Sequence, residues 1–169
     1  LRNSVGVFTS DKHPEWYAKS TGWSGGRELN TPDVIWEEDP EICQLVRNGT
    51  VISGHTSIQG ALDAAQDGDT IEMIVSRHNL TSPITINKNV TLSTASSVGA
   101  RCALVKNFTG TSASADAFTV QNGKTFTLTT ISVGGGSSTT QSGSLINVES
   151  GGNLVLTKGG DAAYQYPFL

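Results

Sequence analysis

Residues 56–74, TSIQGALDAAQDGDTIEMI, read as one amphipathic helix followed directly by a β-strand. Apolar residues recur at the helical spacing i, i+3, i+4 and i+7, which forms one narrow stripe. They are Ile58, Ala61, Leu62 and Ala65. Thr56 and Gln59 have the spacing of a capping box, and Gly68 is placed to end the helix in the left-handed conformation. Because Gly60 destabilises a helix interior by about 1 kcal/mol relative to Ala, we expect this helix to need a surface to pack on.

Composition limits the class of protein. The 169 residues suit one domain, with or without an extended arm, and 19 glycines indicate many turns. The formal net charge of -4 offers no basic face for nucleic acid. No apolar run approaches the roughly 18 residues needed for a membrane span. The low lysine content and the abundance of Ser, Thr, Asn and Gly predict an extracellular or cell-surface location.

Three later segments share one pattern, in which alternating apolar residues flank a polar turn rich in Asn and Gly. They are ITINKNVTL (84–92), FTVQNGKTFTL (118–128) and LINVESGGNLVL (145–156). Val120 lies 34 residues after Ile86 and 28 residues before Val148, and the sequence aligns these three positions. Phe126 corresponds in the same way to Leu154. Internal periods of this length are typical of solenoids.

Two architectures fit these repeats. If the Asn-Gly turns close hairpins, the chain is an antiparallel β-sandwich. If they are corners between successive sheets, the chain winds into a parallel β-helix, whose outer loops can vary in length. The first coil of a solenoid exposes apolar residues and unpaired backbone, which need a cover. A single amphipathic helix ahead of the first coil supplies one, so we expect an all-β, right-handed parallel β-helix of about two to three coils.

The segments TSIQGALDAAQDGDTIEMI and ITINKNVTLST resemble the opening of the pectin-lyase-like superfamily of right-handed parallel β-helix proteins. In that superfamily an IQ-A-DAA-GDTI helix and strand precede coils of the I-I-KNVTL kind. The resemblance covers about residues 55–158 and implies the β-helix fold. It leaves function open, because the superfamily includes polysaccharide lyases and hydrolases, phage tailspikes and non-catalytic bacterial surface adhesins.

The chain before the helix differs from the rest. We expect residues 1–54 to form an N-terminal arm with short strands, and residues 55–169 to form the capped β-helix domain. Strands are predicted at Val34–Trp36 and Ile42–Val46, with Val51–Ile52 following the Asn48-Gly49 turn.

Acidic residues in the coil region do not recur at a common position, which argues against a catalytic or calcium-binding carboxylate cluster. They are Asp69, Glu72, Asp116, Glu149 and Asp161. His78 is expected in an exposed loop. We therefore predict no catalytic residue, no metal site and no cofactor.

Three sets of residues are candidates for other roles. The aromatic residues of the arm form either a sugar-stacking platform or a layer that packs the arm onto the coils. They are Trp16, Tyr17, Trp23 and Trp36. Cys43 and Cys102 form either one disulfide or two buried thiols. Asn79 and Asn107 lie in glycosylation sequons. Asn87 or Asn89, and Asn122, are expected at coil corners, where a buried amide can bond neighbouring turns.

The first functional hypothesis is a non-catalytic module of a larger extracellular protein, used as an adhesin stalk or to present a glycan or host-surface ligand. We expect the C-terminal end to continue into further coils or to pack on a partner. The alternative is a fragment of a β-helix polysaccharide lyase or hydrolase, or of a trimeric phage tailspike.

Overall fold

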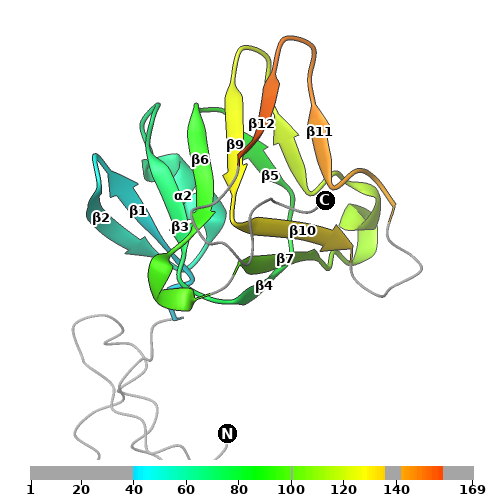
Figure 1. Cartoon of the computed structure of the whole chain (residues 1–169). Helices are drawn as coiled ribbons and strands as arrows, with labels where there is room; N and C mark the ends of the chain where they lie inside the picture. The colour runs from blue at the N-terminus through cyan, green and yellow to red at the C-terminus, as the bar shows by residue number, and fades with distance from the viewer. Residues whose placement is uncertain (1–39, 100, 136–141, 158–169) are drawn as a thin grey trace, which may run out of the picture. The chain divides into compact units, whose positions relative to one another are not determined.

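The computed structural model describes residues 40–99, 101–135 and 142–157, which fold mainly into β-strands with one α-helix (Figure 1). The strand predicted at Val34–Trp36 lies outside these residues. A predominantly β fold with parallel sheets and one helix is confirmed. The strands are β1 (Cys43–Arg47), β2 (Thr50–His55), β3 (Thr70–Met73), β4 (Arg77–Leu80), β5 (Ile84–Ile86), β6 (Val90–Thr94), β7 (Cys102–Lys106), β8 (Phe118–Val120), β9 (Thr125–Thr129), β10 (Ile131–Gly135), β11 (Ile146–Val148) and β12 (Asn153–Thr157).

The strands belong to three sheets, and the chain visits the sheets in turn. The six-stranded sheet has the order β12-β9-β6-β3-β1-β2, and the two three-stranded sheets have the orders β10-β7-β4 and β11-β8-β5. Every pairing among the strands β3 to β12 is parallel. Each pass of the chain therefore adds one strand to each sheet, and β12 starts a fourth pass.

The register between passes is the one that the sequence repeats predict. Val120 pairs with Ile86 on one side and with Val148 on the other. Phe126 pairs likewise with Val90 and Leu154. The segments around these residues join strands of different sheets, so the polar turns within them are corners. The alternative of antiparallel hairpins at these repeats is wrong.

The helix α2 (Ile58–Ala64) is where the sequence predicts it, but both of its ends differ from the prediction. Its N-cap is Ser57, whose Oγ accepts a hydrogen bond from the N–H of Gly60 at 3.0 Å. With Thr56 as the N-cap the helix would begin at Ser57. Because Ser57 is the N-cap, the helix begins one residue later, at Ile58. The side chain of Gln59 binds Asp63 instead of closing a capping box.

The C-terminal end of α2 is satisfied from outside the helix. Its C-cap, Ala65, is extended, and Gly68 takes its φ of +95° in the turn that follows. The ammonium of Lys88, on the corner between β5 and β6, donates to the carbonyls of Leu62, Asp63 and Ala65 at 2.7–2.9 Å. These carbonyls lie at the end of the helix, where the usual i+4 donors are missing, and that of Leu62 also accepts from the N–H of Ala65 at 3.2 Å.

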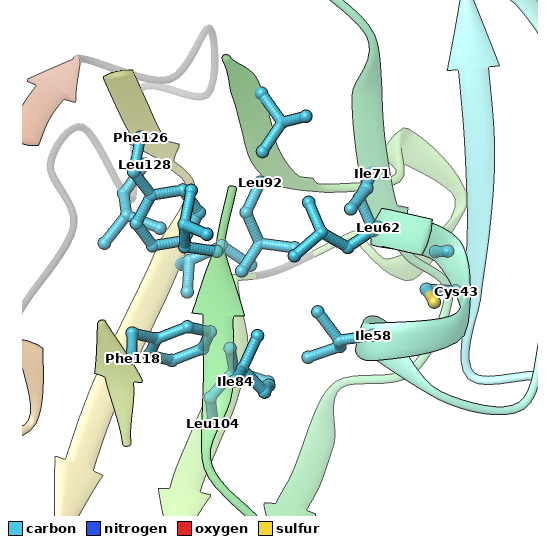
Figure 2. Close-up of a cluster of buried hydrophobic side chains, with 14 of the residues drawn as sticks. Cys43, Ile58, Leu62, Ile71, Ile84, Leu92, Leu104, Phe118, Phe126 and Leu128 are labelled. Carbon is cyan, nitrogen blue, oxygen red and sulfur yellow. The ribbon is translucent and has the colours of Figure 1, made fainter. Parts of the chain in front are cut away.

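The core lies between the three sheets and continues under α2. Ile58 and Leu62 of the helix lie against Ile71 and Ile84 of the first pass (Figure 2). Leu92 continues this cluster toward the later passes. Phe118 and Phe126 extend it, with ring centroids 5.4 Å apart. Burying each Leu, Ile or Phe side chain contributes about 1.5–3 kcal/mol, so the helix adds directly to the same core as the sheets.

The strands before the helix belong to the main sheet. β1 and β2 form an antiparallel hairpin around Asn48 and Gly49, whose φ values are +50° and +76°, the signs of a type I′ turn. β1 also pairs antiparallel with β3. The boundary expected between residues 54 and 55 lies within β2, which pairs with β1, while β1 pairs with β3.

One strand lies where the sequence predicts a loop. His78 is part of β4 and pairs in register with Leu104 of β7. Its side chain is half-buried, and burial lowers its pKa. Residues 77–80 have little intrinsic strand preference, so pairing with the next pass determines their conformation.

Candidate functional site

The outward face of the six-stranded sheet carries a dense set of hydroxyl groups. Along β3, β6 and β9 the side chains of Ile71, Leu92 and Leu128 are buried, so the alternating neighbours point to the opposite face. We name this surface the hydroxyl face. Its hydroxyl groups belong to Thr70, Thr91, Thr125, Thr127, Thr129 and Thr157, which are half-buried, and to Ser93, which is buried. The exposed side chains of Asn153 and Val155 on β12 lie on the same face, since they pair in register with Thr125 and Thr127.

The hydroxyl groups form files that run across the strands. Thr91 pairs in register with Thr70 on one side and Thr127 on the other. Thr129 pairs with Thr157 in the same way, two residues further along. Parallel strands lie about 4.8 Å apart, and two residues along a strand span about 6.6 Å. The hydroxyls therefore lie in register across the strands, with a short repeat.

The centre of the hydroxyl face is uncharged. The strands β6, β9 and β12 contain no Asp, Glu, Lys or Arg. At the edge of the face Glu72 accepts a hydrogen bond from Gln44 at 2.8 Å, which joins β3 to β1. The face thus presents neutral donors and acceptors together with one exposed apolar side chain, Val155, and its charge lies at one side.

A shorter ladder occupies the third sheet. Thr85 pairs with Thr119, and Thr119 pairs with Asn147. Thr85 and Asn147 are exposed, and Thr119 is half-buried. This face is narrower than the hydroxyl face, because each of its strands has only three residues.

The corner before the six-stranded sheet joins successive passes through side chains. The Asn89 amide donates to Asp67 at 3.0 Å and accepts from the N–H of Thr125 at 2.8 Å. Lys124 lies 3.8 Å from the same Asp67 carboxylate. Of the two predicted alternatives, Asn87 and Asn89, it is the half-buried Asn89 whose amide bonds neighbouring passes, so this amide has a structural role.

Three carboxylates of the parallel-strand region have structural partners. Asp69 is buried and forms a bidentate ion pair with Arg47, with contacts of 2.9 and 2.7 Å. This hydrogen bonding to Arg47 lowers the pKa of Asp69. Asp116 accepts from the N–H of Ser144, and Glu149 from that of Asn122. Asp161 lies outside the described residues.

The two cysteines are free thiols in the core. Burial raises the pKa of Cys43 to about 12 and that of Cys102 to about 11. Both thiols stay protonated at neutral pH, and a protonated thiol is a poor nucleophile and a poor metal ligand. Among the residues that the structure describes, no three His, Cys, Asp or Glu side chains gather as a metal site.

One buried cation was not predicted. Lys106 of β7 is only 2% exposed, and its ammonium donates to the carbonyl of Ser142. It also lies 5.3 Å from the centre of the Phe108 ring. The sequence of β7 does not predict this contact. Lys106 occupies an inward position among alternating apolar residues, and its partner Ser142 lies in a loop of the next pass.

The other predicted site residues have mixed outcomes. Trp16, Tyr17, Trp23 and Trp36 lie outside the described residues. Asn79 on β4 and Asn107 just after β7 are both exposed, and the N–H of Asn107 donates to the carbonyl of Leu80. The two sequons therefore lie at the same end of neighbouring strands. None of the helices in the described residues is long and apolar enough to cross a membrane.

Comparisons with protein-family models, with curated proteins and with solved structures gave no match to this chain. The arrangement of the chain's own residues is therefore what indicates its function.

Proposed function

We propose that the chain is a non-catalytic, extracellular β-helix module of a larger cell-surface protein, and that its hydroxyl face binds a neutral glycan. The observation that carries the proposal is the grid of in-register hydroxyls on the six-stranded sheet. The module would serve as an adhesin stalk or as a ligand-presenting domain.

The sheet topology supports the β-helix. Three sheets receive one strand each per pass, in the same order on every pass. Connections between parallel strands of one sheet are right-handed in about 98% of cases, which favours a right-handed coil. The helix α2 and the β1–β2 hairpin lie ahead of the first pass and cover its core and its strand edge, as the cap of a solenoid must.

The chemistry of the face supports a neutral glycan as the ligand. Threonine and serine hydroxyls both donate and accept hydrogen bonds, as sugar hydroxyls do. In-register rows of hydroxyls suit an extended or packed polysaccharide whose own hydroxyls repeat. An acidic polysaccharide would call for Lys or Arg, which β6, β9 and β12 lack.

The carboxylates favour a binding module over a lyase or hydrolase. General acid-base chemistry needs carboxyl groups that face a substrate. Asp69 is instead held by Arg47, and Asp116 and Glu149 accept backbone hydrogen bonds.

The last pass supports continuation into further coils or packing on a partner. Val148 and Leu156 are 38% and 46% exposed, whereas Val120 and Leu128, their in-register neighbours on the preceding pass, are fully buried. Val148 and Leu156 thus continue the rows of core residues, but no described residue covers them.

Binding to a panel of insoluble and immobilised glycans tests the proposal. The whole chain should bind a neutral polysaccharide saturably and without releasing products. Thr127→Arg places a bulky cation in the centre of the hydroxyl face and should abolish binding. Thr119→Arg, on the third sheet, is the matched control and should retain it.

Three results would count against the proposal. Equal loss of binding in both variants would mean that the hydroxyl face is not the site. Product release that depends on a coil carboxylate would favour the lyase or hydrolase. A stable trimer in solution would favour the tailspike.

A further inference from the structure

The turn of the β1–β2 hairpin contains an asparagine followed by a glycine. The chain has two Asn-Gly pairs, Asn48-Gly49 and Asn122-Gly123. An asparagine followed by glycine can close a succinimide ring, because the missing side chain leaves the next backbone nitrogen free to approach. We propose that Asn48 is a deamidation site and that Asn122, with the same local sequence, is protected by the fold.

The reaction is balanced by water alone. The backbone nitrogen of Gly49 attacks Cγ of Asn48, its proton passes to solvent, and the side-chain amide leaves as ammonia. Water then opens the succinimide at either carbonyl and gives aspartate or isoaspartate at position 48. The net change is the uptake of one water and the release of one ammonia.

The turn can reach the reacting geometry without breaking its strand pairing. Asn48 and Gly49 both have positive φ, as in a type I′ turn, and Arg47 pairs with Thr50 across the turn. Rotation of the peptide between Asn48 and Gly49 converts type I′ to type II′ and takes ψ of Asn48 to about -120°. That rotation brings the nitrogen of Gly49 round to Cγ, and glycine tolerates the φ values of both turns.

Nothing described in the structure opposes this rotation at the hairpin. Asn48 and Gly49 are exposed. In the described part of the chain, the N–H of Gly49 donates no backbone hydrogen bond. Apart from Gly49 itself and its two chain neighbours, no residue has an atom within 4 Å of the place where a Cβ on Gly49 would be. The nucleophile is therefore free and unhindered.

The second pair is held in place. The N–H of Gly123 donates to the carbonyl of Gly151 at 3.0 Å, and the N–H of Asn122 donates to Glu149 at 3.1 Å. A Cβ on Gly151 would lie 2.6 Å from the Asn122 side-chain oxygen, so that side chain packs against the next pass. Rotating this peptide would break the bond to Gly151.

The modification would alter the edge of the six-stranded sheet. Isoaspartate lengthens the backbone of the two-residue turn by one carbon, so the pairing of Arg47 with Thr50 cannot keep its register. Arg47 also holds the buried Asp69. We expect β2, the outer strand of the sheet, to exchange its amide protons faster after conversion.

Incubation of the whole chain in mildly alkaline buffer, followed by peptide mapping, tests the proposal. In the native protein Asn48 should convert at least about tenfold faster than Asn122, since one hydrogen bond is worth about that factor in an equilibrium. In denaturant the two rates should become similar, because only the fold separates them. Asn48→Gln should remove the isoaspartate that enzymatic methylation detects in the native protein.

Two results would overturn the proposal. The first is equal conversion of Asn48 and Asn122 in the native protein. The second is an Asn48 that converts in denaturant and stays intact in the native protein, because the hairpin would then protect it.

Discussion

Truncation of Leu62 tests whether α2 completes the core of the coils. Leu62 is fully buried and lies beside Ile71 of the first pass (Figure 2). Leu62→Ala removes three carbon atoms, whose transfer from water is worth about 2.4 kcal/mol at about 0.8 kcal/mol per group. The cavity left behind brings the expected loss to about 2–5 kcal/mol. A domain with a total stability of about 5–15 kcal/mol would lose a large part of it.

Urea denaturation followed by circular dichroism measures this loss. Asp63→Ala is the matched control, because Asp63 is the next residue in the same helix, is exposed, and should change stability by less than about 0.5 kcal/mol. A loss below about 1 kcal/mol for Leu62→Ala would mean that the side chain is not packed in a closed core. The helix would then be an accessory to the sheets and not their cover.

Three further predictions follow from buried and bridging polar groups. Because Arg47 lowers the pKa of Asp69, the pair stabilises the fold above the pKa of the unfolded carboxyl. This contribution is lost as the pH falls through the lower folded value, so Asp69→Asn should weaken the acid dependence of the unfolding midpoint. Lys88→Met should lower the free energy of unfolding by about 1–3 kcal/mol in urea, since three helix carbonyls lose a charged donor; an unchanged midpoint would contradict this. With a pKa of about 12, the Cys43 thiol should react with a disulfide reagent at neutral pH only after unfolding, and prompt reaction in the native protein would show that it is accessible.

The sequence predicts the parts of this fold that depend on periodic apolar residues. The stripe through Ile58 and Leu62 identifies the helix, and the repeats identify the register of Val120 with its neighbours, because both patterns record which side chains face the core. The ends of the helix were predicted less well. Ser57 and Thr56 are both good caps, so the sequence alone does not select between them.

Features that depend on the neighbouring pass were missed. His78 becomes a strand residue because β7 pairs with it, and Lys88 caps the helix across a distance of more than 20 residues in the chain. The sequence shows that Thr91 and Thr127 are polar and lie in strands. It does not show that they stand side by side, because that requires the register of two passes.

A distance across the third sheet tests the stacked passes most directly. Thr85 and Asn147 are exposed and occupy the two outer strands of a parallel ladder, with Thr119 between them. In the double variant Thr85→Cys with Asn147→Cys, spin labels should report backbones about 10 Å apart, which is two strand spacings. A separation well beyond that value, or a broad distribution of distances, would contradict the in-register stack of parallel strands.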